Sequence, residues 1–239
     1  MGSLVKIVSF SGIDGAGKTT QITALQTWLD RSGRRTRLLT FWDDIVILSR
    51  FREFLSHKAF KGDQGIGSPE KPLVRRDKNV TSWPVIAMRF FLYAGDAFHL
   101  AVTVRRLRRG NADVIIFDRY IYDELANLPL NRWLARAFVR LVAALIPKPD
   151  VAYVIDADPA AAFARKPEYP LEFVRNNREA YLTLSRLTGA ITVIAPSTVD
   201  AMAANVRDAL LRLRPRVTRI SPGFPRWSSG MACGLAWGF

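Results

Sequence analysis

The stretch VSFSGIDGAGKTTQ, residues 8–21, constrains the fold more than any other part of the sequence. Gly12, Gly17, Lys18 and Thr19 match the pattern G-x-x-x-x-G-K-[ST], between an apolar strand-like run and a helical pattern. In this context the glycines let the backbone curl, so that successive N–H groups face phosphate oxygens. The helix that follows adds its positive N-terminal end. The pattern therefore predicts a loop that binds the phosphates of a nucleoside triphosphate.

Strand-like and helical segments alternate along the chain. Apolar runs typical of buried strands lie at residues 5–10, 36–42, 113–118, 151–156 and 190–195. Helical patterns lie near residues 19–33, 82–110, 119–146, 172–188 and 198–213. Buried strands that alternate with helices predict an α/β fold, a P-loop NTPase-type doubly wound five-stranded parallel sheet with helices on both faces.

We expect one P-loop domain over residues 1–214, with a small lid at about residues 165–172. Residues 215–239 mix Pro, Gly, Ser and Trp without periodicity, which predicts a poorly ordered tail. Residues 58–79 form a basic segment with several glycines and prolines, typical of a loop, and nothing in it indicates a role.

The net charge of +14 favours anionic partners, and nucleotides are such partners. The basic blocks lack interleaved aromatics, so we do not expect nucleic acid to be a partner. No stretch reaches the roughly 20 uninterrupted apolar residues of a membrane span. Cys233 is the only cysteine, and the start of the chain lacks a signal-peptide pattern. We therefore expect a cytoplasmic protein that does not bind membranes. His57 and His99 have no metal-ligand cluster around them and are interpreted as structural.

Polar residues follow three of the predicted strands, at residues 12–20, 118–120 and 156–159. Because parallel strands end at the same edge of a sheet, these stretches are expected to form one site. Asp118 ends a buried strand, where a carboxylate can hold Mg²⁺ or position an acceptor; capping of the next helix is the structural alternative. Arg119 offers forked donors to a phosphate.

A short segment rich in charge and proline, residues 165–172, separates two predicted helices. Phosphoryl transfer needs cations on the moving group and exclusion of water. Arg165, Lys166, Arg175 and Arg178 are candidates to supply both from a lid. The alternative is an ordinary surface hairpin whose cations are solvated.

At these residues the chain resembles the thymidylate kinases, a family of P-loop nucleoside-monophosphate kinases. SFSGIDGAGKTTQ resembles the phosphate loop of the family, with Asp14 where members carry a loop carboxylate. DRY at residues 118–120 resembles the family's Asp-Arg-Tyr/His motif, and DADPAAAFAR is similar to its lid entrance. EFVRNNREAYLTLS resembles the helix that follows, with Phe173, Arg178 and Tyr181 in register. The resemblance spans about residues 4–213.

The resemblance implies ATP-dependent phosphoryl transfer to a nucleoside monophosphate such as dTMP, with Mg²⁺ as the metal. It implies catalytic roles for Lys18, Asp118, Arg119 and Arg165, and Mg²⁺ ligation by Thr19 and Asp118. It implies that the ATP phosphates meet the residues of the loop, namely Gly12, Asp14, Gly15, Ala16, Gly17, Lys18, Thr19 and Thr20. It also implies a homodimer, which the family often forms.

The chain departs from the family where the acceptor is held. TFWDD replaces Arg-Glu-Pro-Gly, Ala97 stands where the family has an arginine, and Leu128 stands where it has a glutamine. The motif x-x-S-x-x-A-Y-Q that follows Asp-Arg-Tyr reads IYDELANL here. Candidate acceptor-binding residues in their place are Asp43, Arg89, Tyr93, Asp96 and Tyr120, with the loop residues Arg75 and Arg76 as further options.

Because of these departures, three other functions stay open. One is a kinase of another small acceptor, such as a deoxynucleoside. The second is a nucleotide-binding switch or an ATPase associated with nucleic acid, for which the basic blocks would be needed. The third is a nucleotide-binding protein without turnover.

Overall fold

The structure is a computed structural model that describes residues 6–46 and 83–212. Several positions discussed above lie outside the described residues. These are the basic segment 58–79 with Arg75 and Arg76, His57, Cys233 and the predicted tail.

The described residues form a parallel sheet of five strands in the order β2-β3-β1-β4-β5. The strands are β1 (Lys6–Ser11), β2 (Thr36–Thr40), β3 (Val114–Asp118), β4 (Val151–Ile155) and β5 (Ile191–Ile194). The three central strands are almost wholly buried, which explains why they read as continuous apolar runs. The five predicted strands and the parallel α/β fold are confirmed.

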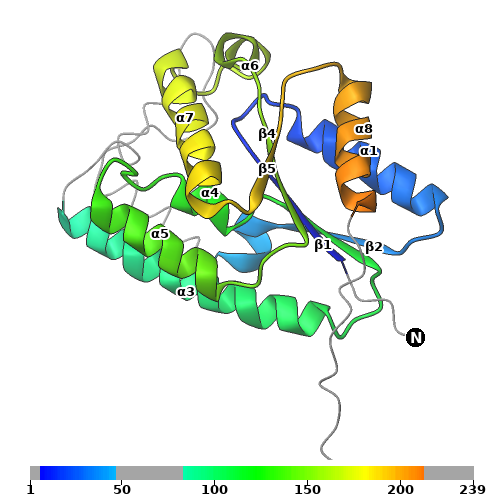
Figure 1. Cartoon of the computed structure of the whole chain (residues 1–239), viewed down its shortest axis with the longest axis horizontal. Helices are drawn as coiled ribbons and strands as arrows, with labels where there is room; N and C mark the ends of the chain where they lie inside the picture. The colour runs from blue at the N-terminus through cyan, green and yellow to red at the C-terminus, as the bar shows by residue number, and fades with distance from the viewer. Residues whose placement is uncertain (1–5, 47–82, 213–239) are drawn as a thin grey trace, which may run out of the picture.

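Helices cover both faces of the sheet (Figure 1). α1 (Lys18–Arg31) and α8 (Val199–Leu211) lie side by side on one face. The other face carries α3 (Trp83–Leu107), α4 (Ile121–Leu125), α5 (Trp133–Leu145) and α7 (Leu171–Thr188). α6 (Pro159–Arg165) leads into α7 above the carboxyl ends of the strands, and a π-helical turn, η1 (Phe41–Ile45), follows β2.

Local sequence explains where the helices near the site begin and end. Asp158 caps α6, because its side chain accepts a hydrogen bond of 2.9 Å from the N–H of Ala161, and Pro159 occupies the first turn. α7 ends at Gly189, whose φ of 59° is the left-handed conformation that glycine adopts easily. The segment from α6 to α7, which contains the expected lid, therefore has a defined beginning and a defined end.

α3 is long and apolar enough, over Pro84–Leu107 and with a mean hydropathy of 1.4, to cross a membrane by length and composition alone. A core helix passes the same test, so a single helix of this kind is weak evidence for a membrane span. In α3, Tyr93, Asp96 and Leu100 are buried against the rest of the fold, but only 22% of the apolar window is buried. The expectation that the chain does not bind membranes stays a prediction.

Candidate active site

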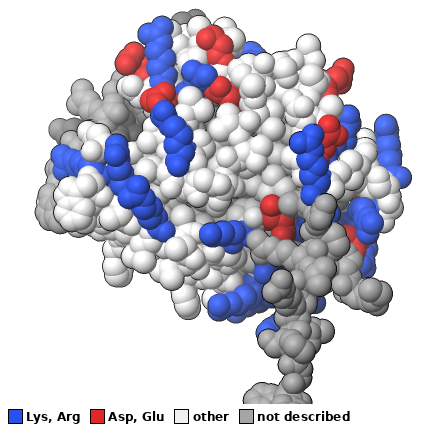
Figure 2. Space-filling view, in the orientation of Figure 1, with Lys and Arg blue, Asp and Glu red and all other residues white. Residues whose placement is uncertain are grey.

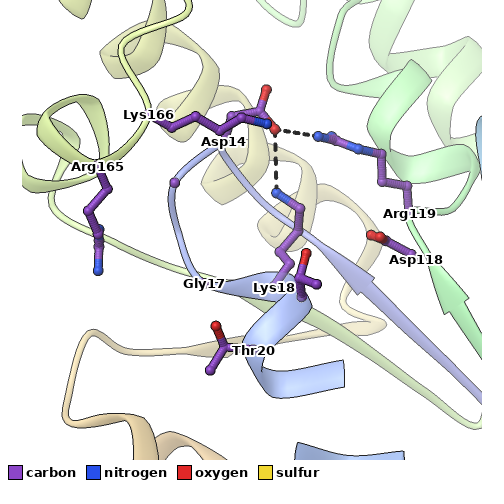
Figure 3. Close-up of a pocket in the computed structure, with 10 residues that line it drawn as sticks. Asp14, Gly17, Lys18, Thr20, Asp118, Arg119, Arg165 and Lys166 are labelled. Carbon is purple, nitrogen blue, oxygen red and sulfur yellow. Dashed lines mark hydrogen bonds and ion pairs between the residues drawn. The ribbon is translucent and has the colours of Figure 1, made fainter. Parts of the chain in front are cut away.

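The three polar stretches lie at one edge of the sheet because β3 and β4 flank β1. Residues of the first two stretches line one pocket, whereas residues 156–159 are not part of its described lining. Phe10 pairs with Asp118, and the N–H of Arg119 donates to the carbonyl of Phe10 at 2.8 Å. A pocket of about 390 Å³ opens there (Figure 3). Its described lining is Asp14, Gly15, Gly17, Lys18, Thr19, Thr20, Asp118, Arg119, Arg165 and Lys166.

The phosphate loop lies so close to its neighbours that two of its positions accept only glycine. Gly12 has a φ of 134°, and a Cβ there would lie 2.5 Å from the carbonyl oxygen of Ile155. Gly15 has a φ of 81°, and a Cβ there would lie 2.3 Å from the carbonyl oxygen of Ala162 in α6. The glycines therefore serve both the curvature of the loop and its contact with β4 and the first lid helix.

Lys18 begins α1, and its ammonium lies inside the loop. Nζ donates to the carbonyls of Gly12 and Ile13, both at 2.9 Å, and lies 3.7 Å from Oδ1 of Asp14. Burial, followed by the nearby charge of Arg119, lowers the pKa of Lys18 to about 8, although Asp14 acts in the opposite direction. The Lys18 ammonium is therefore fixed in position and poorly hydrated, which favours the binding of an anion.

Arg119 is the one described non-glycine residue with a positive φ, at 70°. Nη2 donates to Asp14 at 2.5 Å, and Nη1 donates to Asp123 at 3.1 Å. Burial lowers the pKa of Arg119, but attraction to Asp123 and Asp14 outweighs burial, so the net shift is upward and the guanidinium stays charged. A strained backbone at a charged pocket residue is typical of a functional position.

Asp118 and Thr19 line the same pocket and offer a carboxylate and a hydroxyl, which are oxygen ligands of the kind that Mg²⁺ prefers. Burial raises the pKa of Asp118, and Arg119 and Lys18 oppose that shift. The described residues contain no group of three or more His, Cys, Asp or Glu side chains that could enclose a metal. This donor set fits an Mg²⁺ ion that takes its other ligands from nucleotide phosphates and water.

Two of the four expected lid cations line the pocket. Arg165 ends α6 and points to the side of the loop that carries Thr20, opposite Asp118 and Arg119 (Figure 3). Lys166 follows it and pairs with Glu168 at 3.3 Å. The other two cations form ion pairs with carboxylates. Arg175 pairs with Glu172 at 3.6 Å, and Arg178 holds both oxygens of Asp156 at 2.6 and 2.7 Å.

The five candidate acceptor residues are not among the described lining of this pocket. Asp43 is exposed in η1, and Arg89 donates to the carbonyl of Asn127 at 3.3 Å. Tyr93 and Asp96 lie on the buried side of α3. Tyr120 lies in the core and its hydroxyl donates to the carbonyl of Pro147. Leu128, at the place of the family's glutamine, is also buried in the core.

Sequence reasoning gave no role to Asp123, although it is the buried carboxylate that holds Arg119. The available signal was the acidic residue three positions after Tyr120. Its carboxylate accepts the N–H of Tyr120 at the start of α4, as in a capping box. Tyr181 was noted only for its register, and its contact with Asp123 depends on how α7 packs.

A parallel sheet with a phosphate loop after its central strand, and with Asp118 and Arg119 beside that loop, defines a P-loop nucleotide-binding protein. The chain is 30% identical to a thymidylate kinase of Bifidobacterium longum subsp. infantis over 190 residues, 74% of this chain and 73% of the relative. It is 30% identical to a probable thymidylate kinase of Pyrobaculum aerophilum over 224 residues, 86% of this chain and 96% of the relative. The chain belongs to the thymidylate kinase family.

A search of solved structures finds the same fold. The crystal structure of thymidylate kinase from Ehrlichia chaffeensis matches with a TM-score of 0.52 and 19% sequence identity, over 86% of this chain and 98% of that chain. No family model matches the chain. The sequence-based assignment to the family is confirmed.

Proposed function

We propose that this protein transfers the γ-phosphoryl group of ATP to dTMP and releases dTDP and ADP. Its family membership supports this reaction, and its relatives carry the name thymidylate kinase. The observation that carries the proposal is the position of Arg119, whose guanidinium lies beside the phosphate loop and reaches Asp14 within it. One pocket thus holds cations for two phosphate groups.

The triphosphate is proposed to lie along the loop, where backbone N–H groups, Lys18 and the N-terminal end of α1 bind its oxygens. Arg165 and Lys166 approach from the lid side and neutralise charge on the moving phosphoryl group. Mg²⁺, held by Thr19 and Asp118, would neutralise charge on the same phosphates when bound.

The acceptor phosphate is proposed to bind the side of the Arg119 guanidinium that faces the pocket. An oxygen of that phosphate forms a bond to the γ-phosphorus as the bond from that phosphorus to the bridging β,γ-oxygen breaks, and the electrons leave on ADP. Little covalent chemistry falls to the protein. Its contribution is to align two anions in the pocket and keep water away.

We also propose a homodimer and a cytoplasmic location, without nucleic-acid or membrane partners. The exposed Phe91 and Phe98 on α3 support self-association, since large exposed apolar side chains on one helix are typical of an interface. Light scattering after size-exclusion chromatography tests the dimer, and a monomer at all concentrations would refute it.

A coupled assay of ADP release over a panel of nucleoside monophosphates and deoxynucleosides tests the reaction. We expect turnover with dTMP, a large loss in Lys18→Ala and unchanged turnover in Lys148→Ala. Lys148 is a suitable control because it is exposed and precedes β4, at the opposite end of that strand from the pocket.

A second candidate acceptor follows from Ala97 and Leu128, which stand where the family has an arginine and a glutamine. If another nucleotide or a deoxynucleoside gives a higher kcat/KM than dTMP does, that compound is the acceptor in place of dTMP. ADP release without phosphoryl transfer to any acceptor would refute the proposal that the protein is a kinase.

A further inference from the structure

Asp123 is a buried carboxylate directly behind Arg119. It is the third residue of α4, and its side chain is 1% exposed. Asp14, the other carboxylate that contacts Arg119, is 24% exposed and belongs to the pocket lining. Arg119 therefore pairs with two carboxylates, Asp123 in the core and Asp14 in the pocket.

Four donors from three parts of the fold converge on Asp123. Its Oδ2 accepts from the hydroxyl of Ser11 at 2.6 Å and from the N–H of Tyr120 at 3.0 Å. Its Oδ1 accepts from Nη1 of Arg119 at 3.1 Å and from the hydroxyl of Tyr181 at 2.7 Å. A carboxylate with donors on both oxygens in a buried setting has one orientation, so it fixes whatever it binds.

The two carboxylate oxygens of Asp123 have different partners, and this difference distinguishes a positioning role from helix capping. Capping of α4 needs only the bond from the Tyr120 N–H to Oδ2. Oδ1 accepts from Arg119 and Tyr181, and among the residues that the structure describes it makes no bond to α4. Tyr181 lies on α7, the helix that follows the lid segment, so its hydroxyl ties that helix to the arginine's anchor.

We propose that Asp123 is a positioning residue that, together with Tyr181, holds the guanidinium of Arg119 toward the acceptor phosphate. Nη1 is anchored in the core, and Nη2 is thereby held at the pocket, where it reaches the phosphate loop. The proposal rests on the proposed function, because it assumes that Arg119 binds a phosphate.

The test compares the affinities of dTMP and thymidine by calorimetry, in the wild-type protein and in variants of the full chain. The two ligands differ only by the phosphate, so the ratio of their affinities isolates the contacts that the phosphate makes, and an Arg119→Ala background identifies the share that depends on Arg119. In Asp123→Asn, which keeps the shape but loses the charge, we expect the ratio to fall by about tenfold or more, as for lost bonds to a charged group. Thymidine affinity should stay unchanged.

Tyr181→Phe removes one hydroxyl and should lower the same ratio by a smaller factor, with the fold intact. Glu179→Gln is the matched control. Like Asp123→Asn, it replaces a carboxylate that pairs with an arginine, but Glu179 and its partner Arg186 are exposed on α7. In an Arg119→Ala background Asp123→Asn should have no further effect on the ratio, because its action passes through Arg119.

Equal losses of dTMP and thymidine affinity in Asp123→Asn would overturn the proposal, since they indicate a structural role alone. An unchanged ratio in both Asp123→Asn and Tyr181→Phe would also overturn it, and if Asp123→Asn does not fold, Tyr181→Phe decides the matter. A wild-type protein that binds neither ligand would instead remove the proposed function, and this inference with it. The two failures are therefore distinguishable.

Discussion

The lowered pKa of Lys18 makes ATP binding sensitive to alkaline pH. Burial is the main cause of the shift, from 10.5 to about 8, and the neighbouring charge of Arg119 adds to it. Since the ammonium form binds phosphate, raising the pH through about 8 should discharge the loop lysine while Arg119 stays charged.

The size of the effect follows from the titration of one group. With a pKa of about 8, about nine tenths of Lys18 is protonated at pH 7 and about one tenth at pH 9. Because kcat/KM reports the free enzyme, its value for ATP should fall about tenfold between these two pH values. The phosphates of the nucleotide lose their last proton near a pKa of about 6, so the substrate itself does not titrate in this range.

The assay is ADP release at subsaturating ATP, measured across the pH range in buffers of constant ionic strength. Lys18→Arg is the informative variant, because a guanidinium stays charged throughout the range. Its kcat/KM should be lower than that of the wild-type protein but flat with pH. Bound phosphate stabilises the ammonium, so kcat at saturating ATP should fall at a higher pH than kcat/KM does.

Two results would refute this reasoning. One is a wild-type profile that is flat to pH 9, and the other is the same fall in Lys18→Arg. The free energy of unfolding offers an independent check, because it should change with pH in the opposite direction to kcat/KM. Between about pH 8 and 10.5 the unfolded chain keeps a proton on Lys18 that the folded chain has lost, so this residue's contribution to the free energy of unfolding should rise with pH.

Three further predictions concern other parts of the site. Arg178→Ala should lower the free energy of unfolding by about 1–3 kcal/mol in urea titrations, because it leaves the buried Asp156 without its two-pronged partner; a change near zero would contradict this. Gly15→Ala should weaken ATP binding strongly, since its Cβ meets a backbone oxygen, whereas Gly33→Ala, with open space around it, should leave ATP affinity unchanged; equal effects in calorimetry would count against the close fit of the loop. The raised pKa of Asp118 should make Mg²⁺-dependent kcat/KM fall as the pH decreases toward that pKa, and Asp118→Asn should lose this acidic limb; a limb that survives the substitution belongs to another group.

Local patterns were sufficient for the elements and for the phosphate loop. The three central strands read as apolar runs because each is short and buried. The loop motif is a pattern of eight adjacent residues, and its place between a strand and a helix is the context that it requires. That Asp118 lies beside the phosphate loop could also be expected, since parallel strands end at one edge of the sheet; in the structure Asp118 pairs with Phe10. A helical pattern was expected over residues 119–146, and the structure has α4 and α5 there.

The acceptor side was harder to predict for a physical reason. Tyr120 was expected among the acceptor-binding residues, but its side chain is buried in the core, where its hydroxyl donates to the carbonyl of Pro147. That burial depends on the packing around α4, which periodicity does not indicate. Sequence alone also could not tell that Arg178 meets Asp156, since that contact depends on the angle at which α7 packs.

The sequence by itself determined the sheet, the phosphate loop and the family, because these depend on the order of neighbouring residues and on short-range backbone geometry. Only the tertiary structure decided which carboxylates hold Arg119. Asp123 lies 112 residues from Ser11 and 58 from Tyr181, and strand order and helix packing bring the three side chains within hydrogen-bonding distance. Contacts of that range follow from the packing of the whole chain, which no local pattern of residues records.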